Sequence, residues 1–148
     1  MIDLSPDDIA FLRQARVAHL ATASAAGEPH VIPMCFAFDG THLFTAIDAK
    51  PKRVPLGHLR RVRNLRENPR VSLVVDSYEE DWGRLRYVLI AGRGEILEEG
   101  DERERGLELL REKYSQYRSM PDLGRGPVIR IAPERVVAWH STPSPGPA

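Results

Sequence analysis

Short apolar stretches separated by tight-turn residues constrain the fold of this chain more than any other feature. Residues 29–38 and 42–47 have strand-like patterns, and Asp39-Gly40 between them is a dipeptide typical of β-hairpins. Residues 25–28 form a second turn, between 17–24 and 29–38. Strand patterns recur at residues 70–76, 83–97, 127–131 and 135–140. Consecutive hairpins predict an antiparallel sheet.

Three helical patterns are inserted singly between the strands. Residues 5–16 open with Ser5 as a cap and Pro6 at the first helical position. Residues 58–67 and 101–118 carry apolar side chains at helical spacing. The tally is about six strands and three helices, a mainly β fold with α. Because closure removes exposed strand edges, a sheet of this size is expected to curl into a barrel.

Strands 29–38, 70–76 and 83–97 are apolar on both faces, so they need cover outside the barrel as well as inside. A second copy of the chain could supply that cover, and the pattern therefore predicts a homodimer. Within residues 83–97, Gly92 and Gly94 lie on one face of the strand and predict a bulge or sharp bend.

Length and composition limit the classes of function. The 148 residues suit one domain, predicted over 1–141, with a disordered, proline-rich tail over 142–148. The net charge is zero, which argues against a nucleic-acid binder, and no apolar run is long enough to span a membrane. Cys35 is the single cysteine, so we expect a reducing, cytoplasmic setting.

The segment Lys50-Pro51-Lys52-Arg53 is the best candidate for ligand binding. It places three cationic side chains between a predicted strand and the start of a predicted helix. Basic side chains near unpaired amide groups at a helix start favour phosphate. A solvated basic loop explains the same residues equally well.

The strand end before that segment consists of Thr45, Ala46, Ile47 and Asp48. Its backbone could hydrogen-bond a planar ring while the basic segment holds a phosphate, although an ordinary strand end is the simpler interpretation.

Other chemistry has less support. The five histidines have no metal-ligand spacing, so no metal site is expected, and no nucleophile motif is present. Cys35 is interpreted as a small buried hydrophobe. Trp82 and Trp139 could each stack on a ligand or close a core, and the core is favoured for Trp139.

The order of motifs carries more information than any single one. HLATASAAGEPHVIPMCFAFDG, then LFTAIDAKPKR, then LRRVRNLRENPRVSLVVDSYEEDW resembles the pyridoxamine 5'-phosphate oxidase-like split β-barrel family, in its flavin and deazaflavin oxidoreductase branch. The resemblance runs from about Val17 to Trp139. It implies a six-stranded, FMN-binding-protein-like split barrel that is homodimeric, with cofactor sites where the two subunits meet.

The resemblance also implies roles for particular residues. Val31, Ile32 and Pro33 would border the cofactor ring, and Thr45, Ala46, Ile47 and Asp48 would contact the ring and its side chain. Lys50, Lys52 and Arg53 would hold the phosphate. Trp82 and Trp139 would complete the pocket from the other subunit. No catalytic acid or base can be named, although His30, Met34 and Tyr87 could line the substrate side.

The expected function is an oxidoreductase that uses coenzyme F-420 (F420) or FMN to transfer a hydride to or from a small organic substrate. Arginines beyond those needed for one phosphate, such as Arg60 and Arg61, could follow the polyglutamate tail of F420 and favour that cofactor. They could equally pair with acidic segments of the partner chain. Two alternatives stay open: a non-catalytic flavin-binding carrier, and a haem-binding split barrel.

Overall fold

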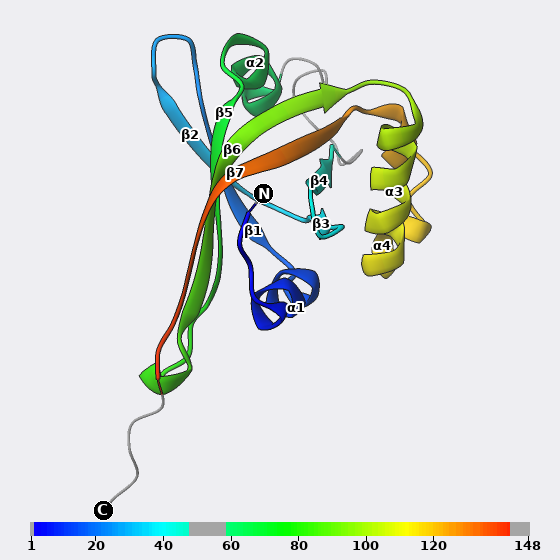
Figure 1. The fold of residues 1–148 in the computed structure, drawn as a ribbon. Helices are drawn as coiled ribbons and strands as arrows, with labels where there is room; N and C mark the ends of the chain where they lie inside the picture. Colours follow the sequence, from blue (N-terminus) through cyan, green and yellow to red (C-terminus); the bar gives the residue numbers. More distant parts are fainter. Residues whose placement is uncertain (1, 48–58, 143–148) are drawn as a thin grey trace, which may run out of the picture.

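A strongly curled antiparallel sheet with helices against it forms the described part of the protein (Figure 1). The computed structural model describes residues 2–47 and 59–142. The strands are β1 (Ala18–Ala23), β2 (Pro29–Met34), β3 (Ala37–Phe38), β4 (Leu43–Ala46), β5 (Arg70–Ser77), β6 (Arg86–Leu97) and β7 (Val128–His140). The helices are α1 (Pro6–Gln14), α2 (Arg60–Glu67), α3 (Asp101–Lys113) and α4 (Ser115–Arg118), with short 3₁₀ turns η2 (Trp82–Arg84) and η3 (Leu123–Arg125). Across these ranges no helix is both long and apolar enough to cross a bilayer.

The strand order brings the two ends of the sheet together. The order is β2-β1-β5-β6-β7-β4-β3, so β2 and β3 are at opposite ends of the hydrogen-bonded sheet. Yet only Cys35 and Phe36 separate these strands along the chain, and so short a link spans about 10 Å. The sheet must therefore curl until its ends meet. We call the Cys35–Phe36 link the seam of the barrel.

Alternating side chains fill the interior. Val71, Leu73 and Val75 of β5 are buried together with Val88 and Ile90 of β6, while the residues between them point outward. This is the period-two pattern that the sequence contains. Phe36 of the seam is fully buried in the same core, so barrel closure is stabilised by a large apolar side chain.

Helices α3 and α4 pack beside β3 and β4, away from the long hairpin arms (Figure 1). Gly106 allows α3 to approach closely, because a Cβ atom there would lie 2.7 Å from Cδ1 of Phe44 in β4. A second core forms between these elements and includes Leu107, Leu110 and Tyr117. This packing places the carboxyl-terminal end of α3 against the seam.

Three predicted elements differ from the structure. Residues 29–38 are not one strand, because the chain leaves β2 at the seam before it enters β3. Residues 101–118 are two helices, because Tyr114 adopts an extended conformation. Residues 127–131 and 135–140 are one continuous strand, β7. The described ranges therefore contain seven strands and four α-helices, where about six strands and three helices were expected.

The predicted irregularity at Gly92 is confirmed. The register between β6 and β7 shifts between Ala91 and Gly92, where the partners change from Arg135 to Pro133. A Cβ atom at Gly92 would collide with the carbonyl group of Ala132. Only glycine permits this close approach of the two strands.

The outer face of the sheet carries a row of side chains that is apolar except for His19. Pro33, His19, Val74, Leu89 and Val137 are successive partners across β2, β1, β5, β6 and β7. Leu89 and Val137 are 38% and 45% exposed. We call this row, together with Val31, Tyr87 and Trp139 beside it, the outer face. The predicted excess of apolar residues outside the barrel is therefore present in the structure.

Candidate functional site

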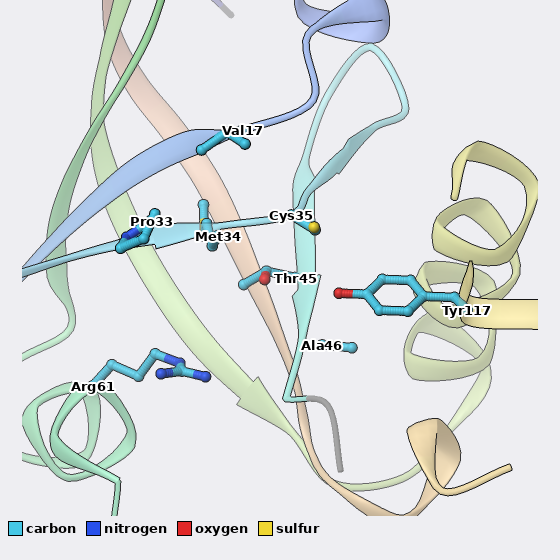
Figure 2. A pocket seen from close by; sticks show the side chains of 8 residues that line it. All are labelled: Val17, Pro33, Met34, Cys35, Thr45, Ala46, Arg61 and Tyr117. Atoms are coloured by element: carbon cyan, nitrogen blue, oxygen red, sulfur yellow. The ribbon is translucent and has the colours of Figure 1, made fainter. Parts of the chain in front are cut away.

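A cavity of about 180 Å³ lies next to the seam (Figure 2). Its walls come from the ends of β2 and β4 and from helices α2 and α4. The described lining residues are Val17, Pro33, Met34, Cys35, Thr45, Ala46, Arg61 and Tyr117. Because β2 and β4 are far apart in the strand order, barrel closure is what brings these residues together.

Three of the predicted site residues meet in this cavity. Pro33 lies at the end of β2, and Thr45 and Ala46 lie at the end of β4. Proline at position 33 suits an edge strand, because β2 pairs with β1 alone. Pro33 and Ala46 give the cavity flat, apolar walls, which suit a planar ring.

Thr45 provides a polar group inside the cavity. The residue is only 4% exposed, and its hydroxyl forms no hydrogen bond with any residue in the described ranges. The Thr45 oxygen faces the space between its strand and the Tyr117 phenol (Figure 2). The Thr45 hydroxyl can therefore offer a hydrogen bond to a ligand in the cavity.

Arg61 reaches the cavity from α2, where its guanidinium group lies across from Ala46 and Thr45 (Figure 2). It was one of the two arginines considered for a cofactor tail. The other, Arg60, lines a separate cavity of about 210 Å³ with Glu28, Pro29 and His30. Adjacent helical residues point in different directions, so α2 presents cations to both cavities.

Four lining residues were not predicted as cofactor contacts. Met34 was proposed only for the substrate side, and Tyr117 was given no role in the site. Cys35, interpreted as a small buried hydrophobe, is only partly buried: it packs against the second core and also lines the cavity. Val17, the fourth of these lining residues, was given no role either. A strand pattern shows which residues share a face of the sheet, but it does not show where β2 ends, and so it does not predict which residues meet at the seam.

Two polar side chains hold the backbone of the seam. The amide of Phe36 donates to the Tyr114 hydroxyl oxygen at 3.1 Å, and that hydroxyl lies 2.8 Å from the Arg16 carbonyl oxygen. The Lys113 ammonium donates to the Phe36 carbonyl oxygen at 2.9 Å and lies over the Phe36 ring. These contacts replace strand pairing where β2 ends and β3 begins.

Burial changes the protonation of both groups. Loss of water, with a smaller effect from the Arg16 charge, lowers the pKa of Lys113 to about 8. Burial raises the pKa of Tyr114 to about 12, so its hydroxyl keeps its proton at any physiological pH.

Three predicted contacts lie outside the cavity in a single chain. Val31 is 65% exposed on the outer face, whereas Ile32 points inward and packs against the barrel core. Ile47 is fully buried. Successive strand residues alternate between faces, so Val31, Ile32 and Pro33 cannot all border one ring through their side chains.

The two tryptophans lie on other surfaces of the same chain. Trp82 is 68% exposed in η2, where its indole N–H lies 3.4 Å from the Tyr78 hydroxyl. Trp139 is 45% exposed on the outer face, 5.7 Å from the Tyr87 ring. The preference for a core position at Trp139 is therefore wrong, and Tyr87 lies away from the described cavity. A role for either tryptophan in a partner's site stays a prediction.

The predicted phosphate segment is not part of the described structure. Asp48, Lys50, Lys52 and Arg53 all lie outside the described residues, which resume at Leu59. The cavity nevertheless lies where β4 ends, directly before this segment in the sequence.

Comparison with known proteins identifies the family. Residues 7–140 match pyridoxamine 5'-phosphate oxidase. The chain belongs to that family. A 5a,11a-dehydrotetracycline/5a,11a-dehydrooxytetracycline reductase of Streptomyces rimosus is 34% identical over 136 residues, covering 89% of this chain and 80% of the reductase. The expected enzyme class, an oxidoreductase, is thus confirmed at the level of the family.

Solved structures share the fold. A conserved hypothetical protein of Mycobacterium tuberculosis is 27% identical with a TM-score of 0.74, over 94% of this chain and 86% of that one. A FAD-binding protein of Mesorhizobium loti is 25% identical with a TM-score of 0.64, over 91% and 94%. Two further structures resemble the chain in fold alone. An F420 reductase is 24% identical with a TM-score of 0.65, over 86% of this chain and 94% of that one. The haem storage protein HutZ of Vibrio cholerae is 20% identical with a TM-score of 0.73, over 93% of this chain and 96% of that one. The predicted split-barrel class is therefore confirmed.

Proposed function

We propose that this protein is an oxidoreductase that binds F420 or FMN beside the seam and acts on a small organic substrate. The observation that carries the proposal is the cavity that brings together Pro33, Thr45 and Ala46, with the Thr45 hydroxyl as a polar group in its wall. Flat apolar walls with a polar group among them suit a ring whose edge carries hydrogen-bonding atoms.

The cavity residues would contact different parts of the coenzyme. Pro33 and Ala46 would lie against the ring and keep water from it. The Thr45 hydroxyl would hydrogen-bond a polar atom on the ring edge, and Arg61 would attract the negative charge of a phosphate or acidic tail. The bound cofactor would supply the hydride chemistry, while the protein fixes the orientation of the two reactants.

Two copies of the chain would complete the site. A cavity of about 180 Å³ is smaller than the roughly 300–1,000 Å³ of typical ligand pockets. Pro33 lines the cavity and also begins the apolar row of the outer face. A second subunit docked on the outer face would therefore lie at the cavity mouth, where its own residues, Trp82 or Trp139 among them, could enclose the cofactor.

F420 is preferred over FMN because cations extend beyond the cavity. Arg60 and Arg61 lie on α2, and the basic segment Lys50, Lys52 and Arg53 precedes that helix. FMN has one phosphate to neutralise, whereas F420 adds a polyanionic tail. The FAD-binding neighbour supports a flavin-type cofactor in general.

The haem alternative has less support from this site. Among the described lining residues of the cavity none is histidine, and His30 lines the separate cavity beside Arg60. A non-catalytic carrier would bind the cofactor at the same site and would differ from the proposed enzyme only in lacking turnover. We further propose a cytoplasmic location, which suits the partly exposed thiol of Cys35.

Titration of the purified protein with F420, FMN and haem, followed by absorbance and fluorescence, tests the proposal. We expect saturable binding of F420 or FMN, with reduction of enones or quinones by the loaded protein. A haem spectrum without binding of either coenzyme would refute it. Binding without turnover over a panel of such acceptors would favour a carrier.

A further inference from the structure

A second and larger cavity lies on the other side of Cys35. It measures about 540 Å³ and shares Val17 and Cys35 with the cavity described above. Its other described lining residues are Arg16, Lys113, Tyr114, Ser115, Gln116 and Arg118. A molecule that occupies both spaces would pass the Cys35 side chain.

The second cavity is rich in positive charge. Arg16, Lys113 and Arg118 line it, and no aspartate or glutamate is among its described lining residues. Their recorded hydrogen bonds go to main-chain carbonyl oxygens: Arg16 to Lys113 at 2.7 Å, Lys113 to Phe36 at 2.9 Å, and Arg118 to Arg111 at 2.8 Å. Within the described ranges none of the three pairs with a carboxylate.

Ion pairing differs among the cations of the described surface. Arg66, Arg84, Arg86, Arg125 and Arg130 each form an ion pair with an aspartate or glutamate. Other arginines of the described ranges form none, and the three cations around the second cavity belong to this second group. What sets these three apart is that they line one cavity together.

Capping of α3 explains part of this cluster. Arg16 and Arg118 donate to carbonyl groups in the last turn of α3, where the helix end carries about half a negative charge. Half a charge does not neutralise two guanidinium groups. Lys113 donates to the Phe36 carbonyl oxygen of the seam and not to the end of α3, so its charge adds to that of the two arginines. The cavity therefore keeps an excess of positive charge beyond what capping requires.

We propose that the second cavity binds an anionic group, such as a carboxylate, of the substrate whose reactive carbon reaches the first cavity past Cys35. This inference rests on the proposed function. Guanidinium and ammonium groups already held by carbonyl oxygens have lost part of their freedom, so an anion would find them oriented. A neutral analogue of the same shape would gain none of this charge-assisted bonding.

A matched pair of unreactive probes tests the proposal: 3-benzoylpropionate and its neutral amide, 3-benzoylpropionamide. Their affinities are measured by calorimetry, with and without bound coenzyme. We expect the carboxylate to bind about 10- to 30-fold more tightly than the amide, the ratio that corresponds to one or two charge-assisted hydrogen bonds.

Substitutions of the lining residues test which side chains cause the preference for the carboxylate. Lys113→Gln and Arg118→Gln should each remove most of the preference for the carboxylate, whereas Lys113→Arg, which retains the charge, should restore it. Arg125→Gln is the control, because Arg125 is an exposed cation outside the second cavity. Circular dichroism and melting curves confirm that each variant is folded. Arg118 neither lines the first cavity nor bonds to the seam, so Arg118→Gln should leave coenzyme affinity unchanged.

The outcomes separate the two proposals. Equal affinity for the two probes, or no detectable binding of either, overturns the anionic-substrate proposal even if the coenzyme binds. A carboxylate preference that survives in Lys113→Gln and Arg118→Gln also overturns it. A carboxylate preference that depends on these residues, in a protein that takes neither F420 nor FMN, supports the anion site and refutes the oxidoreductase assignment.

Discussion

The main-chain amide of Phe36 donates a hydrogen bond to the hydroxyl oxygen of Tyr114 at 3.1 Å, joining the barrel seam to the residue between α3 and α4. The same hydroxyl lies within hydrogen-bond distance of the Arg16 and Phe36 carbonyl oxygens. One side chain thus ties three segments together. Both candidate cavities are built around this point.

Replacement of Tyr114 by phenylalanine should destabilise the fold. The variant leaves the buried Phe36 amide without its partner, which costs about 1–3 kcal/mol. Urea denaturation measures the change. Tyr78→Phe is the matched control. Because Tyr78 is exposed, removal of its hydroxyl should lower the free energy of unfolding by less than about 0.5 kcal/mol. Equal stability of the two variants would show that the seam does not depend on Tyr114.

Replacement of Thr45 by valine should weaken coenzyme binding without loss of stability. Valine keeps the shape of threonine and removes a hydroxyl that has no partner within the described chain, so the free energy of unfolding should stay the same or rise. Loss of one hydrogen bond to the ligand predicts an increase in Kd of about 5- to 10-fold. Fluorescence titration measures Kd, and an unchanged value would exclude Thr45 as a ligand contact.

The double variant Lys52→Ala/Arg53→Ala should weaken coenzyme binding by at least about 1.5–3 kcal/mol, because charge-assisted bonds to phosphate are lost. Arg125→Ala removes an exposed arginine elsewhere and serves as the control. The same titration reports both affinities. If the double variant binds as tightly as the wild type, the phosphate must be held by other residues.

A charge introduced on the outer face should separate the subunits. Val137→Asp would place a carboxylate in the apolar row between two copies, and burial of that charge would be prohibitive. Light scattering after gel filtration should report a dimer for the wild type and a monomer for the variant, with weaker coenzyme binding in the monomer. Thr41→Asp, in an exposed turn, should remain dimeric. A monomeric wild type with full coenzyme affinity would contradict the shared site.

Lys113 should make stability depend on pH in a defined window. Its pKa is about 8 in the folded protein and 10.5 when unperturbed, so between these values the unfolded chain binds more protons. The contribution of Lys113 to stability therefore rises as pH increases from about 8 to 10.5. Lys113→Met should lack this rise, which we expect to be on the order of 1 kcal/mol because the side chain is only partly buried.

Denaturation of wild type and Lys113→Met at pH 7.5 and pH 10 measures the difference between their stabilities at roughly the two ends of the window. Arg16, Cys35 and Tyr114 face Lys113 and are present in both proteins, so the comparison isolates the change at Lys113. Arg125→Met, which removes an exposed arginine elsewhere, controls for the loss of a positive charge. A constant difference between wild type and Lys113→Met would mean that Lys113 is not buried in solution.

Sequence periodicity predicted most of the strands, but not the break between β2 and β3 or the continuity of β7. The resemblance to the family singled out Pro33 beside Thr45 and Ala46 as candidate ring contacts, and the three residues line one cavity. Tyr117 and Cys35 were missed because their role depends on where the barrel closes. The position of closure depends on the order of all the strands in the sheet, so no local sequence pattern predicts it. Arg16 and Lys113 were missed for the same reason, since 97 residues separate them along the chain.

The seam also limits how such a protein can diversify. A lengthened Cys35–Phe36 link would shift both the walls of the candidate cavities and the hydrogen-bonded frame that supports them, since the same few peptide groups belong to each. Insertions, the usual means by which enzymes reshape their pockets, are therefore penalised here. New specificity would have to arise mainly through exchange of side chains, or through changes in the neighbouring subunit.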